Sequence, residues 1–154
     1  MDLNIVLFEP EIPQNTGNIA RTCACLGAHL HLVEPMGFRL SSKQLGRASM
    51  DYWEKVDITR WACTAEFLEA HGNDQLRLFT GNCSQCYTDV EYDKGCYLVF
   101  GRESRGIDKD ILAAYERDCV RIPMVSDMRS LNLSNSVAIA AYEVMHRFGF
   151  EGLV

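Results

Sequence analysis

The chain has 154 residues, enough for one domain with a single sizeable core. Hydrophobic residues make up 47% and charged residues 23%, a balance typical of globular proteins that excludes a disordered chain. No apolar run approaches the roughly 20 residues of a membrane-spanning helix, and the start MDLNIVLFEP lacks the features of a signal peptide. We therefore expect a cytoplasmic protein with no membrane partner.

The charge is unevenly distributed along the chain. A net charge of −6, from 15 basic and 21 acidic residues, disfavours a protein that coats nucleic acid by bulk electrostatics. Residues 35–50 nevertheless contain no acid, and Arg39, Lys43 and Arg47 recur there every four residues. If this stretch is helical, the three cations share one face. The pattern alone fits either a solvated face or a surface for an anionic partner.

Strand and helix patterns alternate along the chain. Short apolar runs predict strands at residues 3–8, 29–33, 75–80, 96–101 and 119–123. Helical patterns are expected at residues 15–27, 41–48, 59–72, 108–116 and 133–148. The first helix should begin at an N-cap of Asn15 or Thr16 and stop at Gly27. The alternation predicts one α/β domain over residues 1–154, with a mainly parallel sheet flanked by helices.

The last predicted helix is apolar around nearly its whole circumference. Its apolar positions include Val137, Ile139, Ala141, Tyr142 and Met145. A helix with one solvent face would not carry such a pattern. We expect this helix to be central in the fold or to meet another subunit on its outer face.

The seven cysteines predict reduced thiols, because the number is odd and no secretory signal precedes them. The pair Cys83 and Cys86 supplies only two of the four ligands of a structural zinc site, and no second pair lies nearby. A redox pair of this spacing is expected at a helix N-terminus, which stabilises the thiolate. We therefore expect incidental thiols and no metal site, with metal or redox use as the less favoured alternative.

Three polar loops follow predicted strands, at the edge where parallel α/β sheets bind ligands. They read PEIPQNTGN, FGRESRG and IPMVSDMRSLNLSNS. The second has glycines five positions apart, but Ile107 and Asp108 stand where a phosphate loop needs Lys and Ser or Thr, which disfavours a nucleoside triphosphate. Residues 134–136 fit helix caps, and the loop charges fit solvated surface groups. Neither account explains why three separate loops share this composition.

The same loops carry a resemblance to a known family. The segments PQNTGNIAR (13–21), LVFGRESRG (98–106) and IPMVSDMRSLNLSNSVAIAAYE (122–143) resemble, in order, the three motifs of the SPOUT, or α/β-knot, RNA ribose 2′-O-methyltransferases. EPEIPQNTGNIAR and EPMGF (34–38) are further similar to the small TrmL-type members. Those members lack an added RNA-binding domain and methylate the wobble nucleotide of tRNA.

The resemblance implies a deep trefoil knot in the C-terminal part, whose loop holds S-adenosylmethionine in a bent form. It implies a homodimer through the last helix, with Tyr142 at a dimer contact. The implied substrate is the ribose of cytidine or modified uridine 34 in tRNA, with leucine isoacceptors expected, and S-adenosylhomocysteine is the second product.

The resemblance also implies roles for individual residues. Arg21 is expected to help activate the 2′-hydroxyl, by stabilising an oxyanion rather than as a base, because arginine stays protonated. The polar positions that orient the groups around it are Asn18, Glu103, Ser130 and Asn132. The expected cofactor contacts, many through the backbone, are Phe79, Thr80, Gly101, Ile122, Met124, Ser130 and Leu131. The expected RNA contacts are Arg39, Lys43, Arg47, Arg102, Arg105 and Arg129.

Taken without the resemblance, the residues leave a second class open. An α/β nucleotide-binding or RNA-binding module without catalysis would fit the acidic balance equally well. A methyl-transfer assay on tRNA discriminates between the two classes.

Overall fold

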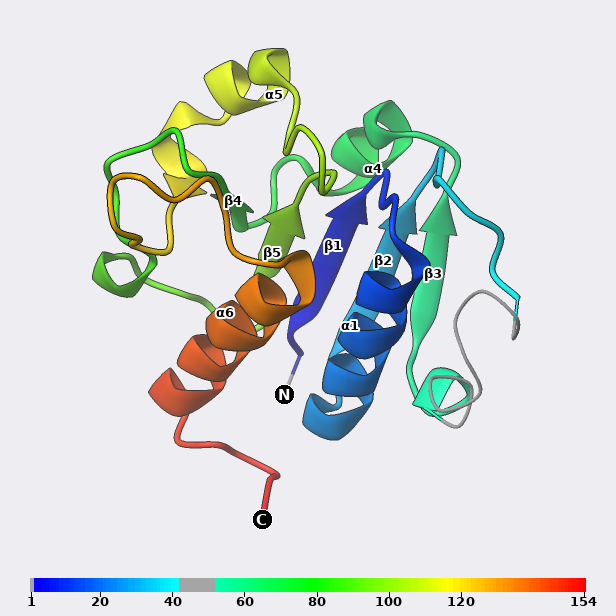
Figure 1. Cartoon of the computed structure of the whole chain (residues 1–154). Coiled ribbons are helices and arrows are strands. Elements are labelled where there is room, and N and C mark those ends of the chain that lie inside the picture. The colour runs from blue at the N-terminus through cyan, green and yellow to red at the C-terminus, as the bar shows by residue number, and fades with distance from the viewer. Residues whose placement is uncertain (1, 42–51) are drawn as a thin grey trace.

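The five predicted strands form one parallel sheet together with a sixth (Figure 1). The computed structural model describes residues 2–41 and 52–154. The strand order is β3-β2-β1-β5-β4-β6, and every pair of neighbours is parallel. The strands are β1 (Asn4–Phe8), β2 (His29–Val33), β3 (Ile58–Trp61), β4 (Leu76–Phe79), β5 (Tyr97–Phe100) and β6 (Cys119–Val120). The expected α/β architecture with a parallel sheet is confirmed.

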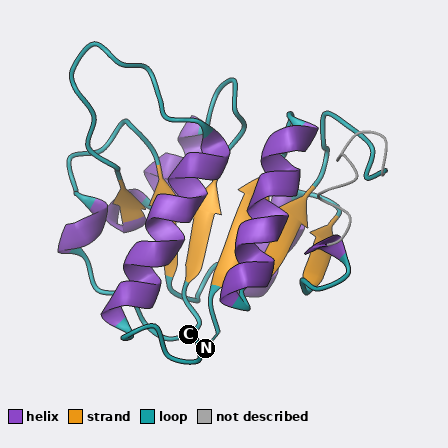
Figure 2. Ribbon diagram, turned by 60° about the horizontal axis from the view of Figure 1, so that its bottom comes forward, coloured by secondary structure: helices purple, strands orange, loops and turns teal. Residues whose placement is uncertain are grey.

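Helices cover both faces of this sheet (Figure 2). They are α1 (Pro13–Leu26), α4 (Thr64–His71), α5 (Lys109–Ala114) and α6 (Leu133–Arg147), with 3-10 turns η1 (Tyr87–Asp89) and η2 (Glu116–Asp118). Alternate strand residues point to opposite faces. Thus Ile5 and Leu7 of β1 pack in the core beneath α1 and α6, whereas Val6 and Phe8 pack with Phe67 of α4. No helix of the described chain is long and apolar enough to cross a membrane.

Two predicted boundaries were wrong. The expected helix at 59–72 is instead strand β3 followed by α4, because Ile58–Trp61 pairs in parallel with β2 and this tertiary pairing overrides the local helical pattern. Helix α1 begins at Pro13 with Ile12 as N-cap, so Asn15 lies within its first turn. Proline is favoured at this position because its missing N–H has no helical partner to lose. The expected stop at Gly27 is confirmed by its left-handed backbone, with φ +64°.

Other predicted helices match the structure or lie outside the described residues. The expected helix at 108–116 corresponds to α5, and the expected helix at 133–148 corresponds to α6. The predicted helix at 41–48 falls almost wholly in the stretch that the structure does not describe.

The order of the strands places a switch point between β1 and β5. The chain leaves β1 towards β2 on one side, whereas it leaves β5 towards β6 on the other side. Connections that diverge in this way open a crevice at the carboxyl ends of the two strands, where α/β sheets bind ligands. The polar loops therefore meet at a position suited to a site.

Helix α6 buries one side against the sheet and α1 but leaves apolar groups on its outer side. Val137, Ala140 and Val144 are fully or almost fully buried. Ile139 and Tyr142 are 38% and 48% exposed, one turn apart on the outer side. Since α1 and α6 cover the same face of the sheet (Figure 1), these exposed groups belong to an outer surface that both helices share.

A buried histidine lies on the opposite face of the sheet. His31 of β2 is 4% exposed and is surrounded by the rings of Trp61, Phe67, His71 and Tyr97. Trp61 Nε1 donates to His31 Nδ1 at 3.1 Å, so the other ring nitrogen carries the proton and donates to Asn4 Oδ1 at 3.2 Å. Burial, followed by the charges of the neighbouring His29 and His71, lowers the pKa of His31 to about 3.

We predict that His31 makes the protein sensitive to acid. Its pKa lies near 6.5 in the unfolded chain and about 3 in the fold, so its contribution to stability is complete above pH 6.5 and is lost as the pH falls towards 3. Over that window one such group adds a slope of at most about 1.4 kcal/mol per pH unit. Urea unfolding at several pH values should show a flatter profile for His31→Gln than for the wild type.

The exposed His146 of α6 supplies the matched control, because His146→Gln should keep the wild-type slope. Equal slopes for all three proteins would show that His31 is not the acid-sensitive group.

Candidate active site

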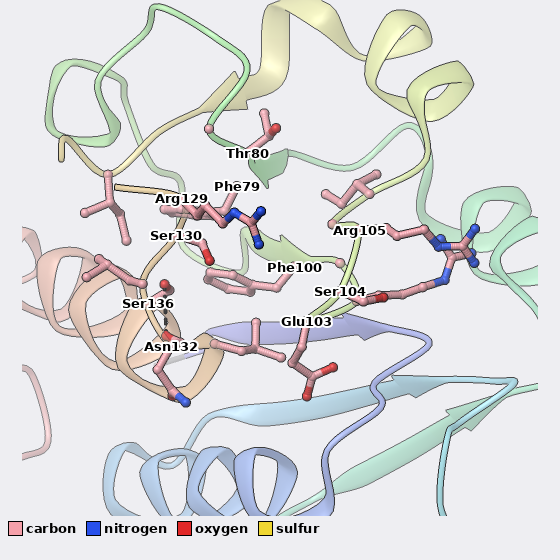
Figure 3. Close-up of a pocket in the computed structure, with 18 of the residues that line it drawn as sticks. Phe79, Thr80, Phe100, Glu103, Ser104, Arg105, Arg129, Ser130, Asn132 and Ser136 are labelled. Atoms are coloured by element: carbon pink, nitrogen blue, oxygen red, sulfur yellow. Dashed lines mark hydrogen bonds between the residues drawn. The ribbon is translucent and has the colours of Figure 1, made fainter. Parts of the chain in front are cut away.

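A cavity of about 760 Å³ opens at the carboxyl edge of the sheet, beside the switch point (Figure 3). Its walls are the loops that follow β4, β5 and β6, and the first turns of α1 and α6 close one side. The lining consists of residues 79–82, 100–107 and 129–133, with Ile12, Asn15, Ile122, Met124 and Ser136. Small-molecule sites are commonly clefts of about 300–1,000 Å³, so this cavity can hold a cofactor-sized ligand.

Two stacked aromatic rings form an apolar part of the cavity wall. Phe79 ends β4 and Phe100 ends β5, and their ring centroids lie 4.6 Å apart with planes inclined by 15°. Phe100 is only 2% exposed, whereas Phe79 is half-buried. The arrangement offers a rigid flat surface beside polar groups, as is usual in sites that bind ring-containing ligands.

The loop after β5 closes tightly on itself. Gly106 N donates to Arg102 O at 2.8 Å, and Arg102 N donates to Gly106 O at 3.2 Å. A Cβ atom at Gly101 would lie 2.1 Å from the Gly106 carbonyl carbon and 2.2 Å from Ile107 N, so no side chain fits there. Gly106 adopts φ +71°, which favours glycine. The two glycines of the GRESRG segment therefore serve loop closure.

Arg102 is held by two carboxylates. Its Nε donates to Glu9 Oε2 at 2.7 Å, and its Nη1 donates to Asp108 Oδ1 at 2.7 Å. The side chain is 12% exposed. Hydrogen bonding to Arg102 lowers the pKa of Asp108, and the same hydrogen bond raises the pKa of Arg102. With its charge paired in this way, Arg102 is better placed to hold the loop than to meet RNA.

Glu103 fastens the loop after β5 to the start of α1. Its carboxylate accepts hydrogen bonds from Glu11 N at 2.8 Å, Ile12 N at 3.0 Å and Asn15 Nδ2 at 3.2 Å. The N-cap Ile12 has no capping side chain, so an acid from a distant segment satisfies this helix start and faces the positive end of its dipole. In return, Glu11 accepts from the N and Oγ of Ser104 at 2.9 and 2.8 Å.

Asn132 links the third loop to the same network. It is the N-cap of α6, and its Oδ1 accepts from Ser134 N at 2.9 Å and from Ser134 Oγ at 2.6 Å. Its Nδ2 donates to Asn15 Oδ1 at 3.0 Å. The chain of bonds from Glu103 through Asn15 to Asn132 thus joins all three polar loops. The cap is Asn132 rather than Ser134, Asn135 or Ser136.

Asn15 is a site residue that sequence reasoning missed. It was expected only as a helix cap, yet it is 5% exposed and bonds both Glu103 and Asn132. Its place within the PQNTGN segment was the available signal. Phe100 was also missed, because its position inside an apolar strand gives no sign that it faces a cavity.

All seven residues expected to contact a cofactor line this one cavity. They are Phe79, Thr80, Gly101, Ile122, Met124, Ser130 and Leu131. Glu103, Ser130 and Asn132, expected to orient the reacting groups, line it as well. The structure therefore brings together predicted site residues that are up to 53 positions apart (79 and 132) in the sequence.

Asn18 and Arg21 are the exceptions among the predicted catalytic residues. Both are exposed on α1 and neither lines the cavity. The Arg21 guanidinium carbon lies 4.7 Å from the centre of the Tyr52 ring, a cation–π contact. Asn18 and Arg21 lie on the outer side of the α1 and α6 layer, the side on which Tyr142 of α6 is exposed.

The predicted RNA-binding cations are distributed over several places. Arg129 and Arg105 line the cavity, and Figure 3 shows Arg129 extending towards Phe79 and Phe100 while Arg105 points away. Arg39 is exposed after β2. Lys43 and Arg47 lie outside the described residues.

The thiols show no sign of activation. All seven cysteines are free, and burial raises the pKa of Cys83, the opposite of what a reactive thiolate requires. Across residues 2–41 and 52–154, no three or more His, Cys, Asp or Glu side chains gather in a way that could hold a metal ion. The C-x-x-C pair thus gains no support as a redox centre.

The fold, the cavity and its three loops define a methyltransferase family. Residues 2–142 match the SpoU rRNA Methylase family, and the chain belongs to that family. It is 47% identical over 153 residues to tRNA (cytidine(34)-2'-O)-methyltransferase of Escherichia coli strain K12, covering 99% of this chain and 98% of that protein. It is 44% identical over 150 residues to the enzyme of the same name from Saccharophagus degradans, covering 97% of each.

Solved structures agree with this assignment. A structure described as "Structural insights into the 2-OH methylation of C/U34 on tRNA" superposes with a TM-score of 0.89 at 43% identity, covering 96% of this chain and 91% of that one. An AdoMet-bound rRNA methyltransferase from Sinorhizobium meliloti superposes with a TM-score of 0.84 at 26% identity, covering 95% of this chain and 56% of that one.

We predict that removing the Glu103 carboxylate destabilises the fold. Glu103→Ala leaves three donors at the start of α1 without their acceptor, and hydrogen bonds to charged groups contribute about 1.5–3 kcal/mol. We expect a loss of about 2 kcal/mol, or a fall of about 4–8 °C in the melting temperature. Glu103→Gln keeps one acceptor oxygen and should lose less.

Glu116→Ala, at an exposed glutamate of η2, is the control and should melt like the wild type. A melting temperature for Glu103→Ala equal to that of the control would show that Glu103 does not stabilise the start of α1.

Proposed function

We propose that this protein transfers a methyl group from S-adenosylmethionine to the ribose 2′-oxygen of nucleotide 34 in tRNA, a cytidine or a modified uridine. The main support for the proposal is the cavity, because every residue expected to hold the cofactor lines it. Relatives that match this chain over nearly their whole length are named for this activity. Leucine isoacceptors are the proposed substrates, and the cytoplasm is the proposed location.

The cavity residues fit S-adenosylmethionine by size and chemistry. The stacked Phe79 and Phe100 offer a flat apolar surface, and Thr80 and Ser130 add polar atoms at the same cavity. The closed loop from Gly101 to Gly106 gives the wall a fixed backbone. When bound, the cofactor supplies a methyl group already activated on a sulfonium. The protein has to align a 2′-oxygen with that group and assist the loss of a weakly acidic proton.

Arg21 is the proposed residue for the 2′-hydroxyl. Its guanidinium can stabilise the oxyanion through forked N–H groups, with Asn18 one turn earlier on the same side of α1. Glu103 and Asn132 act through position, since their polar atoms are engaged in joining the three loops. Ser130 lines the cavity wall, and we assign it to orient the sugar.

A homodimer is proposed because one chain does not assemble these groups. Arg21 and Asn18 lie outside their own cavity, on the outer side where Ile139 and Tyr142 expose apolar surface. If two copies pair through this side, Arg21 of one copy can reach the cavity of the other. Such a C2 interface uses the same patch on both copies.

A knot in the C-terminal part is proposed from the path of the loop between β4 and β5. This loop forms two backbone hydrogen bonds with the residue that follows β6. Tyr87 N donates to Arg121 O at 3.0 Å, and Arg121 N donates to Gln85 O at 2.9 Å. It also contacts the end of α6, where Arg147 Nη1 donates to Val90 O at 2.8 Å. We infer that the chain threads this loop. When the two termini are pulled apart in a single-molecule force experiment, the contour length of the unfolded chain should be shorter than about 3.6 Å per residue, because a tightened knot holds some residues back from extension.

The proposed RNA surface comprises Arg129 and Arg105 at the cavity, with Arg39, Lys43 and Arg47 from the acid-free segment. Arg102 contributes less, because Glu9 and Asp108 already pair with its charge. A local patch can act in a protein with net charge −6, since screening at physiological salt limits exposed charges to a reach of about 8 Å.

We predict that Arg21→Ala reduces kcat for methyl transfer to unmethylated tRNA by about 100-fold or more, the scale of losing an oxyanion donor. Binding of S-adenosylmethionine, measured by calorimetry, should stay unchanged because the Arg21 guanidinium is assigned to the ribose 2′-hydroxyl rather than to the cofactor. Lysine should restore little, since it lacks the planar fork. Near-normal turnover of the alanine variant would refute the role.

The same variant tests the dimer. Chains carrying Arg21→Ala, mixed with chains carrying Gly101→Val, should regain activity, because the intact cavity of the first meets the intact Arg21 of the second. If Arg21 serves its own cavity, the mixture stays inactive.

We predict a second effect on the dependence of tRNA affinity on salt. Arg129→Ala should flatten the plot of log affinity against log salt by roughly 0.7–0.9 if one phosphate contact is lost, and the double variant Lys43→Ala with Arg47→Ala should flatten it by about twice as much. Lys94→Ala, at the opposite edge of the sheet and paired with Glu151, is the control and should not change it. If the slope of log affinity against log salt is unchanged in the double variant, then Lys43 and Arg47 are solvated surface residues that do not contact the tRNA.

A further inference from the structure

Two arginines near the three loops are held by different kinds of partner. Arg102 is held by Glu9 and Asp108, which neutralise its charge and occupy its N–H groups. Arg21 is held by the ring of Tyr52, with 4.7 Å between the guanidinium carbon and the ring centre. Among the described residues, the Arg21 guanidinium makes no ion pair or hydrogen bond. Within that part of the chain, no group occupies its charge or its five N–H donors.

The Tyr52 ring has a defined place in the fold. Tyr52 and Trp53 are helical, and the Tyr52 carbonyl accepts from Lys55 N at 3.0 Å in the turn that follows. The next residues of this turn, Trp53 and Val56, pack against the core beneath α1 and α6. Tyr52 is therefore carried by an anchored turn, and its ring can define the position of a long side chain on α1.

An aromatic face suits an arginine that has to act on a ligand. A carboxylate partner would fix the guanidinium but would also compete with the ligand for its N–H groups and cancel its charge. A ring fixes the guanidinium by its face, through the quadrupole, and leaves the N–H edge open. Ordering the side chain before the substrate arrives also reduces the entropy lost on binding.

We propose that Tyr52 is a positioning residue for Arg21, which it holds over its ring with the N–H edge free for the ribose 2′-oxygen or an adjacent phosphate. This inference rests on the proposed function of Arg21. It assigns a role to a residue outside the three polar loops and outside the cavity.

A graded set of substitutions tests the role of the ring. Tyr52→Phe and Tyr52→Trp keep an aromatic face and should keep kcat, whereas Tyr52→Leu keeps only apolar bulk. The exposed cation–π contribution of about 0.5–1 kcal/mol corresponds to a fall in kcat of about 2- to 5-fold for Tyr52→Leu. The KM for S-adenosylmethionine should not move. In an Arg21→Ala background, Tyr52→Leu should have no further effect.

A measurement without turnover separates this inference from the proposed function. In NMR spectra, the Arg21 side-chain resonances should carry a ring-current shift that persists in Tyr52→Phe and disappears in Tyr52→Leu. If the wild type transfers no methyl group to tRNA, the proposed function fails, and the NMR shift still decides whether the pair exists. Equal kcat for the leucine and phenylalanine variants, or an equal fall in the Arg21→Ala background, would overturn the positioning role.

Discussion

The arrangement of the site depends on the hydrogen bonds that the Glu103 carboxylate accepts. It accepts three hydrogen bonds at the start of α1, whose N-cap has no capping side chain of its own. Asn15, which is bonded to Glu103, is also bonded to Asn132, the N-cap of α6. One polar network therefore fixes the N-terminal ends of α1 and α6, the two helices on one face of the sheet. Because the loops after β1, β5 and β6 converge on it, the cavity wall and the outer helix surface keep a fixed relation.

The use of arginine in the site follows from the partners around each side chain. Arg102 is half-buried between two acids and holds a loop in place, whereas Arg129 extends into the cavity (Figure 3) and Arg21 packs on an aromatic ring. The three share one chemistry but differ in how much charge and donor capacity remains for a ligand. An acidic protein can therefore present a few effective cations to RNA, since no carboxylate within residues 2–41 and 52–154 forms an ion pair with Arg21 or Arg129.

Much of the fold and of the cavity could be predicted from the sequence, because the signals are local. The alternation of apolar runs with helical patterns gave the parallel sheet, and the resemblance of three loops gave seven residues that line one cavity. Contacts between distant segments could not be predicted. Strand β3 depends on pairing with β2, the capping of α1 depends on an acid about 90 positions away, and the pairing of Arg102 depends on the path of Glu9. The position of Arg21 outside the cavity likewise depends on how α1 packs.

The most direct measurement is a map of 2′-O-methyl groups in total tRNA from cells with and without this protein. We expect methylation at nucleotide 34 to disappear from a small set of tRNAs, leucine isoacceptors among them, while every other position keeps its methyl groups. Unchanged methylation at nucleotide 34, or a loss confined to other positions or to ribosomal RNA, would contradict it.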